Sequence, residues 1–368
     1  MLMAASLAFF ACDDEDTEKT PETVVTLDRT ELNLNVGFTE TLVATVTPPL
    51  QGDAKVVWAT DNEVVASVED GVVTALADGE VTITASVGES KATCTVTVVY
   101  VAPKIGDYYY SDGTWSDGGL VSIEADGLNP VWAATKPAPI AGKTVVGIVC
   151  QTDENRIAAG DKENGYTHGY VMALKNAHGP DKTTTYWSAD MEFSCLKAAK
   201  LASTWYGHLK GYEDTMTVQT TYGENINMMP AFDWTLNDFP LTAPASSSGW
   251  FLPSTGQLWD LVANFCGNEV AVAMKGWQTI SRDATYNCDV TVSYDALARL
   301  NSVMSEIPAA DKDVLVVDDE DHPFCSLWAS TPYDDESACI IEVGSEGLIE
   351  CMANWYNADC FARPILAF

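Results

Sequence analysis

Histidine and cysteine are the residues of this chain that could hold a transition metal. The histidines are His168, His178, His208 and His322, and none has a second histidine or a carboxylate four residues later. His322 and Cys325 stand three apart, but no second pair of ligands accompanies them, and the sequence contains no Cys-x-x-Cys. Zinc sites need such pairs at close spacing. We therefore expect no metal site.

The usual catalytic motifs are also missing. The sequence has neither a Gly-x-Ser-x-Gly nucleophile turn nor a glycine loop that would hold phosphates. Carboxylates are abundant, yet no two of them are distinguished as the acid and base of a glycosidase. We expect no catalytic residue and no cofactor, although an enzyme that acts on glycans remains an alternative.

Two acidic runs could in principle bind calcium. Asp318-Asp319-Glu320-Asp321 and Asp334-Asp335-Glu336 are rich in carboxylate oxygens, the ligands that Ca²⁺ prefers. Neither run has the regular alternation and the glycine of a calcium-binding loop. We interpret both as solvated loops, and we expect the second, which lies near the C-terminus, to contribute to a recognition surface.

The overall charge of the chain limits the classes of molecule that it can bind. The chain has 53 acidic and 19 basic residues and a net charge of −34. Such a chain repels phosphate backbones, which argues against nucleic-acid binding. Its hydrophobic fraction of 47% is nevertheless that of a globular protein. Cationic partners and neutral glycans remain compatible with this composition.

The N-terminus has the pattern of an exported, lipid-anchored protein. Residues 2–11 are almost entirely apolar, Cys12 follows directly, and residues 13–16 are all acidic. The pattern resembles a bacterial lipoprotein signal, which implies a signal peptide at 1–11 and lipidation of Cys12. Residues 12–23 would form an acidic tether, and the resemblance implies a surface-exposed outer-membrane location. The other nine cysteines form an odd set and are interpreted as small buried hydrophobic residues.

Residues 24–100 read as a series of short strands. Runs of alternating polarity recur every eight to twelve residues and are separated by turn signals such as Asp70-Gly71. This spacing predicts a β-sandwich with Trp58 in its core. The motifs Trp58-x-x-Asp-Asn, Val65-Ala-Ser-Val and Gly79-Glu-Val-Thr-Ile-Thr-Ala resemble the bacterial Ig-like family, group 2. That resemblance implies a spacer or adhesion module.

Residues 105–368 mix strands with helices and predict an α+β domain. Strands are expected at 144–149 and 168–174. A helix should begin after Ser254, because Ser254 and Gln257 have the spacing of a capping box and an apolar stripe follows. Further helices are expected at 295–307 and 190–201.

Four segments of this domain match the sequence pattern of one protein family. They are the stretch from Gly106 to Trp115, Ser248-Gly-Trp-Phe-Leu-Pro, Leu327-Trp-Ala-Ser-Thr-Pro-Tyr and the terminal Ala362-Arg-Pro-Ile. Together they resemble the C-type-lectin-like proteins that diversity-generating retroelements diversify in bacteria. The expected fold class is therefore multidomain, an all-β Ig-like sandwich followed by an α+β C-type-lectin-like domain.

The resemblance places a variable recognition segment at 329–361. Exposed Met352, Trp355 and Tyr356 would form an apolar patch there; alternatively, these side chains form part of the core. The segment 350–361 has no clear helical or strand period. The residues expected to contact a ligand are Tyr333, Asp334, Asp335, Glu350, Met352, Trp355, Tyr356, Asn357 and Asp359.

These observations favour a binding protein. The expected function is that of a cell-surface lipoprotein whose C-terminal domain binds an extracellular glycan or protein ligand and is held on an Ig-like stalk. Its other partner would be the membrane, through the lipid on Cys12. A glycan-acting surface enzyme and a structural pilus or surface-layer component remain the alternatives.

Overall fold

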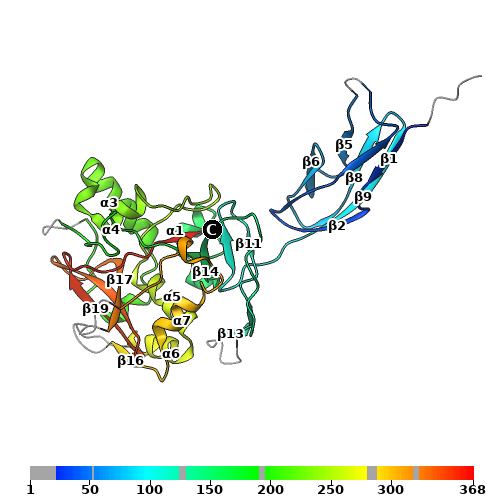
Figure 1. The fold of residues 1–368 in the computed structure, drawn as a ribbon. Helices are drawn as coiled ribbons and strands as arrows, with labels where there is room; N and C mark the ends of the chain where they lie inside the picture. Colours follow the sequence, from blue (N-terminus) through cyan, green and yellow to red (C-terminus); the bar gives the residue numbers. More distant parts are fainter. Residues whose placement is uncertain (1–21, 52–53, 124–129, 190–194, 280–287, 318–322) are drawn as a thin grey trace, which may run out of the picture. The chain divides into compact units, whose positions relative to one another are not determined.

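The computed structural model describes residues 22–51, 54–123, 130–189, 195–279, 288–317 and 323–368. The predicted signal peptide, Cys12, most of the tether, the acidic run at 318–321 and His322 lie outside the described residues. The chain divides into two compact units, of which the first ends at Val101 and the second begins at Ala102 (Figure 1).

The first unit consists of strands. They are β1 (Val24–Leu27), β2 (Glu31–Asn35), β3 (Thr39–Thr41), β4 (Ala44–Thr47), β5 (Val57–Thr60), β6 (Ala66–Glu69), β7 (Val72–Ala75), β8 (Gly79–Val87) and β9 (Ser90–Val99). Three sheets have the orders β2-β9-β8-β5, β3-β7-β6 and β1-β4. Alternate residues of the two longest strands point inward, for example Ile83 and Val96, and form a core that belongs to this unit alone.

The turn between β6 and β7 is an example of a structure that the local sequence determines. Asp70 has φ of 47° and Gly71 has φ of 87°, and two consecutive positive values are what a tight type I′ hairpin turn needs. A Cβ atom on Gly71 would also lie 2.6 Å from the carbonyl oxygen of Leu42. The Asp-Gly pair therefore fixes this hairpin.

The second unit combines strands and helices. Its strands are β10 (Tyr108–Tyr110), β11 (Trp115–Ser116), β12 (Leu120–Ile123), β13 (Pro130–Trp132), β14 (Val145–Gln151), β15 (Tyr170–Ala173), β16 (Asp289–Thr291), β17 (Phe324–Pro332), β18 (Ser337–Gly344), β19 (Leu348–Trp355) and β20 (Ile365–Ala367). Its helices are α1 (Ala159–Glu163), α2 (Ala202–Trp205), α3 (Gly211–Tyr222), α4 (Pro230–Leu236), α5 (Thr255–Cys266), α6 (Asn268–Trp277) and α7 (Ala296–Ser302). Short 3₁₀ turns are η1 (Glu154–Arg156), η2 (Gly223–Met228) and η3 (Ala309–Asp311).

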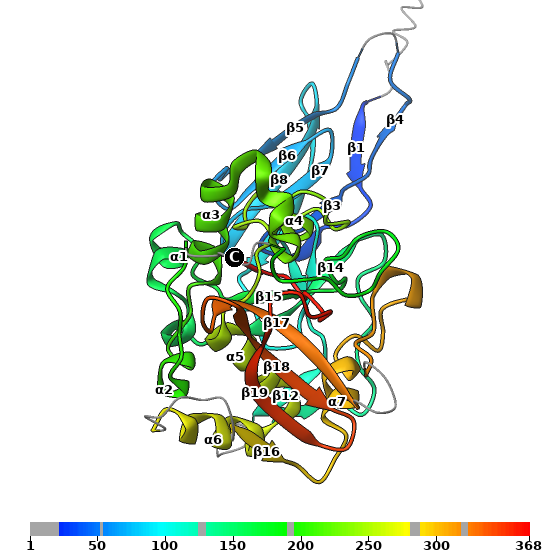
Figure 2. The same ribbon diagram turned by 90° about the vertical axis from the view of Figure 1, so that its left-hand side faces the viewer.

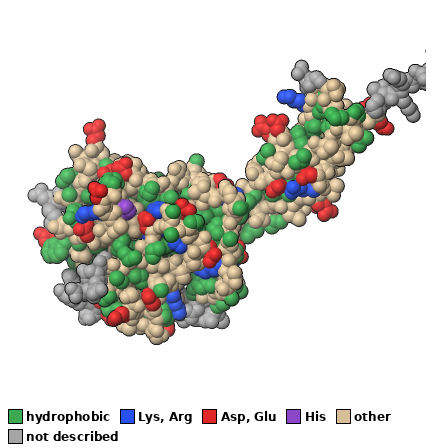
Figure 3. All heavy atoms as spheres, viewed as in Figure 1, with side chains coloured by type: hydrophobic (Ala, Val, Ile, Leu, Met, Phe, Trp, Pro, Cys, Tyr) green, Lys and Arg blue, Asp and Glu red, His purple; other side chains and the backbone are tan. Residues whose placement is uncertain are grey.

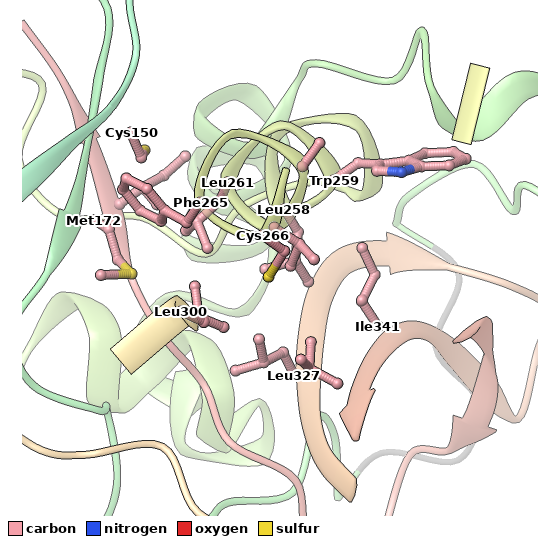
Figure 4. Packing of buried hydrophobic residues seen from close by; sticks show 14 of the residues in the cluster. Cys150, Met172, Leu258, Trp259, Leu261, Phe265, Cys266, Leu300, Leu327 and Ile341 are labelled. Carbon is pink, nitrogen blue, oxygen red and sulfur yellow. The ribbon is translucent and has the colours of Figure 1, made fainter. Parts of the chain in front are cut away.

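Helix α5 packs between two larger sheets. One sheet has the order β11-β10-β14-β15-β20 and the other the order β16-β19-β18-β17. Figure 4 shows Met172 of the first sheet on one side of the helix and Leu327 and Ile341 of the second sheet on the other. The α5 face that begins at Leu258 and ends at Phe265 thus joins both sheets into one core.

The second sheet is covered on both faces. Ile341 and Cys351 point into the core that contains α5, whereas Ile340 belongs to a separate core that α4 and neighbouring segments cover. Figure 2 shows α3 and α4 at one end of this sheet, beside β17. β18 is buried along its whole length, and β19 pairs with it as far as Trp355, so this pairing holds the backbone at the end of β19.

Helix predictions were confirmed where the local signal was strongest. Helix α5 begins after Ser254 with the capping box that the sequence indicates. The helix expected at 295–307 is shorter, because α7 ends at Ser302 and only turns follow before Pro308. The helix expected at 190–201 is wrong over its described part: residues 195–200 contain no helix, and α2 begins at Ala202.

The closing segment also differs from expectation. Residues 348–355 form the regular strand β19, paired along its length with β18, although the sequence there shows no clear period. Buried Ile349 and Cys351 alternate with the half-buried Leu348, Glu350 and Met352. Because Leu348 and Met352 are themselves apolar, this alternation of burial does not appear as an alternation of polar and apolar residues.

Candidate ligand-contact surface

The predicted contact residues come from two turns that meet at one end of the second sheet. Asp334 and Asp335 lie between β17 and β18, and residues 356–359 follow β19. The hydroxyl of Tyr356 donates to the carbonyl oxygen of Asp334 at 2.6 Å, and its backbone N–H donates to that of Glu336 at 3.0 Å. Glu350 lies farther along β19 and is half-buried, away from these turns.

Two of the predicted contact residues are buried and cannot reach a ligand in solvent. Tyr356 is fully buried and stacks on Trp187, with ring centroids 4.7 Å apart and an angle of 12° between the rings. Tyr333 is buried in the α5 core. Met352 is half-buried against the same cluster as Tyr356. The expected apolar patch of three side chains is therefore reduced to one, because strand pairing turns its members to different sides.

Trp355 is the side chain that remains exposed. It is 58% exposed, the largest value for any aromatic residue that the structure describes. It ends β19, where it pairs with Ser337 of β18, and its backbone N–H donates to the side chain of Asn354 at 2.9 Å. Asn357 and Asp359 are exposed beside it. A large aromatic on a fixed backbone offers contact area at low entropic cost.

A segment far away in the sequence completes this surface. The backbone N–H of Trp187 donates to the carbonyl oxygen of Tyr356 at 2.9 Å, which aligns 185–189 with the closing turn. Lys182 forms an ion pair with Asp359 at 3.0 Å and lies 4.7 Å from the ring centre of Tyr186. Sequence reasoning missed Lys182 and Tyr186, because no local signal relates them to a turn 177 residues away.

Asp334 is held in its charged form. Partial burial acts to raise its pKa, but the hydroxyl of Ser337, the backbone N–H of Glu336 and the charge of Lys200 outweigh this and lower the pKa. The backbone N–H of Ala199 donates to the carbonyl oxygen of Pro332 at 2.9 Å. The segment 195–201 therefore borders this end of the sheet from another side.

The cysteines near this surface are not reactive groups. Burial raises the pKa of Cys339 and of Cys351, so both thiols stay protonated and are poor nucleophiles. Within the described ranges, no three His, Cys, Asp or Glu side chains gather as a metal site would require.

Comparison with known proteins identifies the first unit. Residues 22–97 match the family model of the bacterial Ig-like domain, group 2. These residues form a bacterial Ig-like domain. The group 2 domain covers about a fifth of the chain, and the prediction made from its motifs is confirmed.

Solved structures were also compared with the chain. A fimbrial protein from Bacteroides ovatus ATCC 8483 is 15% identical, with a TM-score of 0.43, over 94% of this chain and 70% of that one. Domains 4 and 5 of the S-layer protein SbsC are 21% identical, with a TM-score of 0.19, over 21% of this chain and 51% of that one. No curated protein matches the chain.

None of the helices formed by the described residues has both the length and the apolar character needed to cross a bilayer.

Proposed function

We propose that this protein is a surface lipoprotein that binds an extracellular glycan or protein ligand through the exposed end of β19. The group 2 Ig-like domain would act as the spacer and the lipid on Cys12 as the anchor. The observation that carries the proposal is the exposure of Trp355 at the end of a strand whose backbone is paired with the buried strand β18. Exposed tryptophans on rigid scaffolds are the side chains most enriched among binding hot spots.

The surroundings of Trp355 also suit recognition. Asn357 supplies an amide that can both donate and accept, and Asp359 is oriented by its ion pair with Lys182. Tyr186 adds a second aromatic ring, 38% exposed. A rigid aromatic anchor ringed by oriented polar groups is a common composition for a protein surface that binds sugars or proteins.

We further propose a C-type-lectin-like fold for residues 105–368. The four segments that carry the resemblance are physically connected. β10 and β20 belong to the same sheet, Phe251 bridges to Ile365, and Leu327 bridges to Phe361. Arg363 is buried, and its guanidinium donates to the carbonyl oxygens of Ala173 and Asp313 at 2.9 and 2.7 Å. These contacts support a fixed frame around 329–361.

Diversification of 329–361 by a retroelement is part of the same proposal. It predicts that sequence variation between sibling genes concentrates at exposed positions such as Asp335, Asn357 and Asp359 and spares buried Tyr356. Sequencing of the 3′ ends of sibling genes tests this, and variation spread evenly over buried and exposed codons would contradict it.

The decisive experiment is Trp355→Ala in the full chain, assayed on a glycan array and by binding to host cells. We expect a loss of affinity of at least tenfold with an unchanged melting temperature, because the side chain is exposed and supports no core. Val316→Ala, another exposed apolar position, is the matched control and should bind normally.

Tyr356→Ala separates binding from folding. Removal of this buried ring should lower the free energy of unfolding by about 3–5 kcal/mol. Binding that survives Trp355→Ala, or a large fall in melting temperature in that variant, would overturn the proposed site.

A further inference from the structure

A hollow of about 760 Å³ lies beside the start of α3. Its lining comes from the extended segment 195–201, from Thr204 and His208, and from the first turns of α3. The segment 195–201 is tied to the end of β17 through the hydrogen bond from Ala199 to Pro332. The hollow therefore adjoins the same end of the second sheet as the Trp355 surface.

The charge of this hollow is opposite to that of the chain. Lys197, Lys200 and Lys210 all line it, although the chain as a whole carries −34. Lys210 is paired with Glu213 at 2.9 Å. Lys197 and Lys200 are exposed and form no ion pair with any residue that the structure describes. Figure 3 shows acidic and basic side chains interspersed over the visible face of the second unit.

Two acidic residues line this hollow, and both already have partners: Glu213 is paired with Lys210, and Asp214 is held by other side chains. Asp214 is buried, and its Oδ2 lies 3.0 Å from Nε2 of His208 and accepts the hydroxyl of Ser330 at 2.7 Å. The backbone of His208 is held in turn, because its carbonyl oxygen accepts the hydroxyl of Ser254 at 2.6 Å. This carboxylate is thus turned toward the interior and leaves Lys197 and Lys200 available for an anion.

A second hollow, of about 750 Å³, shares Lys210, Glu213 and Thr217 with the first. Its wall carries Thr220 and Thr221, whose hydroxyls each donate to a carbonyl oxygen of α3 at 2.8 Å. A hydroxyl that has donated its proton still has lone pairs to accept with. Asp161 and Glu163 also line this second hollow. Its lining therefore presents hydroxyl and carboxyl acceptors, which suit the hydroxyl donors of a sugar and place any anionic group of the ligand at the lysine end.

We propose that the two hollows form one groove that binds an acidic oligosaccharide. The carboxylate of a uronic-acid unit lies between Lys197 and Lys200, and the hydroxyls of the neighbouring sugars donate to the threonine wall of α3. Lys210 and Glu213 line both hollows, at the place where the two meet. This inference rests on the proposed function as a binding protein and names its ligand class.

The test uses the full chain and an oligosaccharide of galacturonic acid, with its fully methyl-esterified form as the uncharged match. Calorimetry should detect binding of the charged form, with at least tenfold weaker binding of the ester. Affinity should fall as sodium chloride is raised, because the lysines are exposed. Lys197→Gln/Lys200→Gln should weaken binding of the charged form at least tenfold with an unchanged melting temperature.

Lys275→Gln provides the matched control. Lys275 is an exposed lysine in the last turn of α6, outside both hollows, so its loss removes one positive charge from the chain, as each of the two substitutions in the groove does. Its variant should bind like the wild type. Equal weakening by Lys275→Gln would show a nonspecific charge effect and would overturn the groove.

Three other outcomes would also overturn it. These are equal binding of the charged and esterified forms, unchanged binding in the double variant, and stronger binding of polyglutamate than of the uronate, which would indicate an acidic peptide. Trp355→Ala keeps the two proposals distinguishable. If the uronate binds weakly to the double variant but normally to Trp355→Ala, the groove is supported as the binding site for the uronate, and the Trp355 surface is excluded as that site. If the wild type does not bind the uronate but binds another ligand in a way that depends on Trp355, only the groove proposal is contradicted.

Discussion

Trp355 and Tyr356 are neighbours in the chain and lie in opposite environments. Trp355 projects into solvent, whereas Tyr356 stacks on Trp187 and hydrogen-bonds to Asp334. Both are aromatic, and both stand in a stretch without a clear period. Only the partners that surround each ring distinguish a contact residue from a core residue. The predicted list of contact residues therefore needed correction at Tyr333 and Tyr356, while Trp355, Asn357 and Asp359 lie at the surface.

At the same scale, the burial of Asp161 predicts that the stability of the fold depends on pH. Asp161 is buried in α1, and its carboxylate accepts the hydroxyl of Tyr170 at 2.7 Å. Burial raises its pKa from an ordinary value of 3.8 to about 6, against the effect of that hydrogen bond. The folded state therefore holds this proton more tightly than the unfolded chain. The resulting stability is fully present below the unfolded pKa and is lost as pH rises through about 6.

Asp161→Asn should remove this dependence. Between pH 5 and pH 7 the wild type should lose about 1 kcal/mol more unfolding free energy than the variant, from the shift of that one carboxyl. Urea denaturation at the two pH values measures the difference. Asp335→Asn, an exposed position, serves as the control, and pH profiles that are parallel for wild type and Asp161→Asn would contradict the prediction.

At the scale of elements, one side chain joins the starts of two helices. The Oε1 of Gln257 accepts the backbone N–H of Ser254 at the start of α5 and that of Gly211 at the start of α3, each at 3.0 Å. A Cβ atom on Gly211 would lie 2.4 Å from this oxygen, so α3 begins with glycine at the closest approach. The capping box of α5 was visible in the sequence, but its contact with α3 was not.

Replacement of Gln257 tests this junction. Gln257→Leu leaves two buried N–H groups without an acceptor and should lower the free energy of unfolding by about 2 kcal/mol or more. Gln257→Glu keeps an acceptor oxygen at this position, so its free energy of unfolding should fall less than that of Gln257→Leu. Chemical denaturation of the three proteins measures this ranking, and a leucine variant as stable as the wild type would show that Oε1 is dispensable.

At the scale of the whole molecule, the chain contains two units with separate cores. Among the residues that the structure describes, the core of the group 2 Ig-like domain extends no farther than Val98, and the second unit builds its own cores around α5 and α4. Separate cores are compatible with the proposed arrangement of a spacer followed by a binding domain.

Cys12 provides the prediction at this scale. If it carries the lipid, Cys12→Ser should move the protein from the membrane fraction to the soluble fraction, because the apolar chains that anchor it are lost. Asp13→Asn, next to the same site, should stay in the membrane fraction. Fractionation followed by immunoblotting gives the answer, and a serine variant that still sediments with membranes would refute the anchor.

The sequence alone determined the features that depend on neighbours in the chain. The strands of the Ig-like domain follow from alternation and from turns such as Asp70-Gly71, and α5 follows from its capping box and apolar stripe. Tertiary structure decided which closing residues are exposed, brought Lys182 to Asp359, and gathered Lys197 and Lys200 beside α3. The first two of these features join residues far apart in the chain, and the third depends on how the segment 195–201 folds against α3. The free energy of all three comes from packing and charge that exist only after folding. A local pattern therefore identified the elements, but it could not identify the surface that they form.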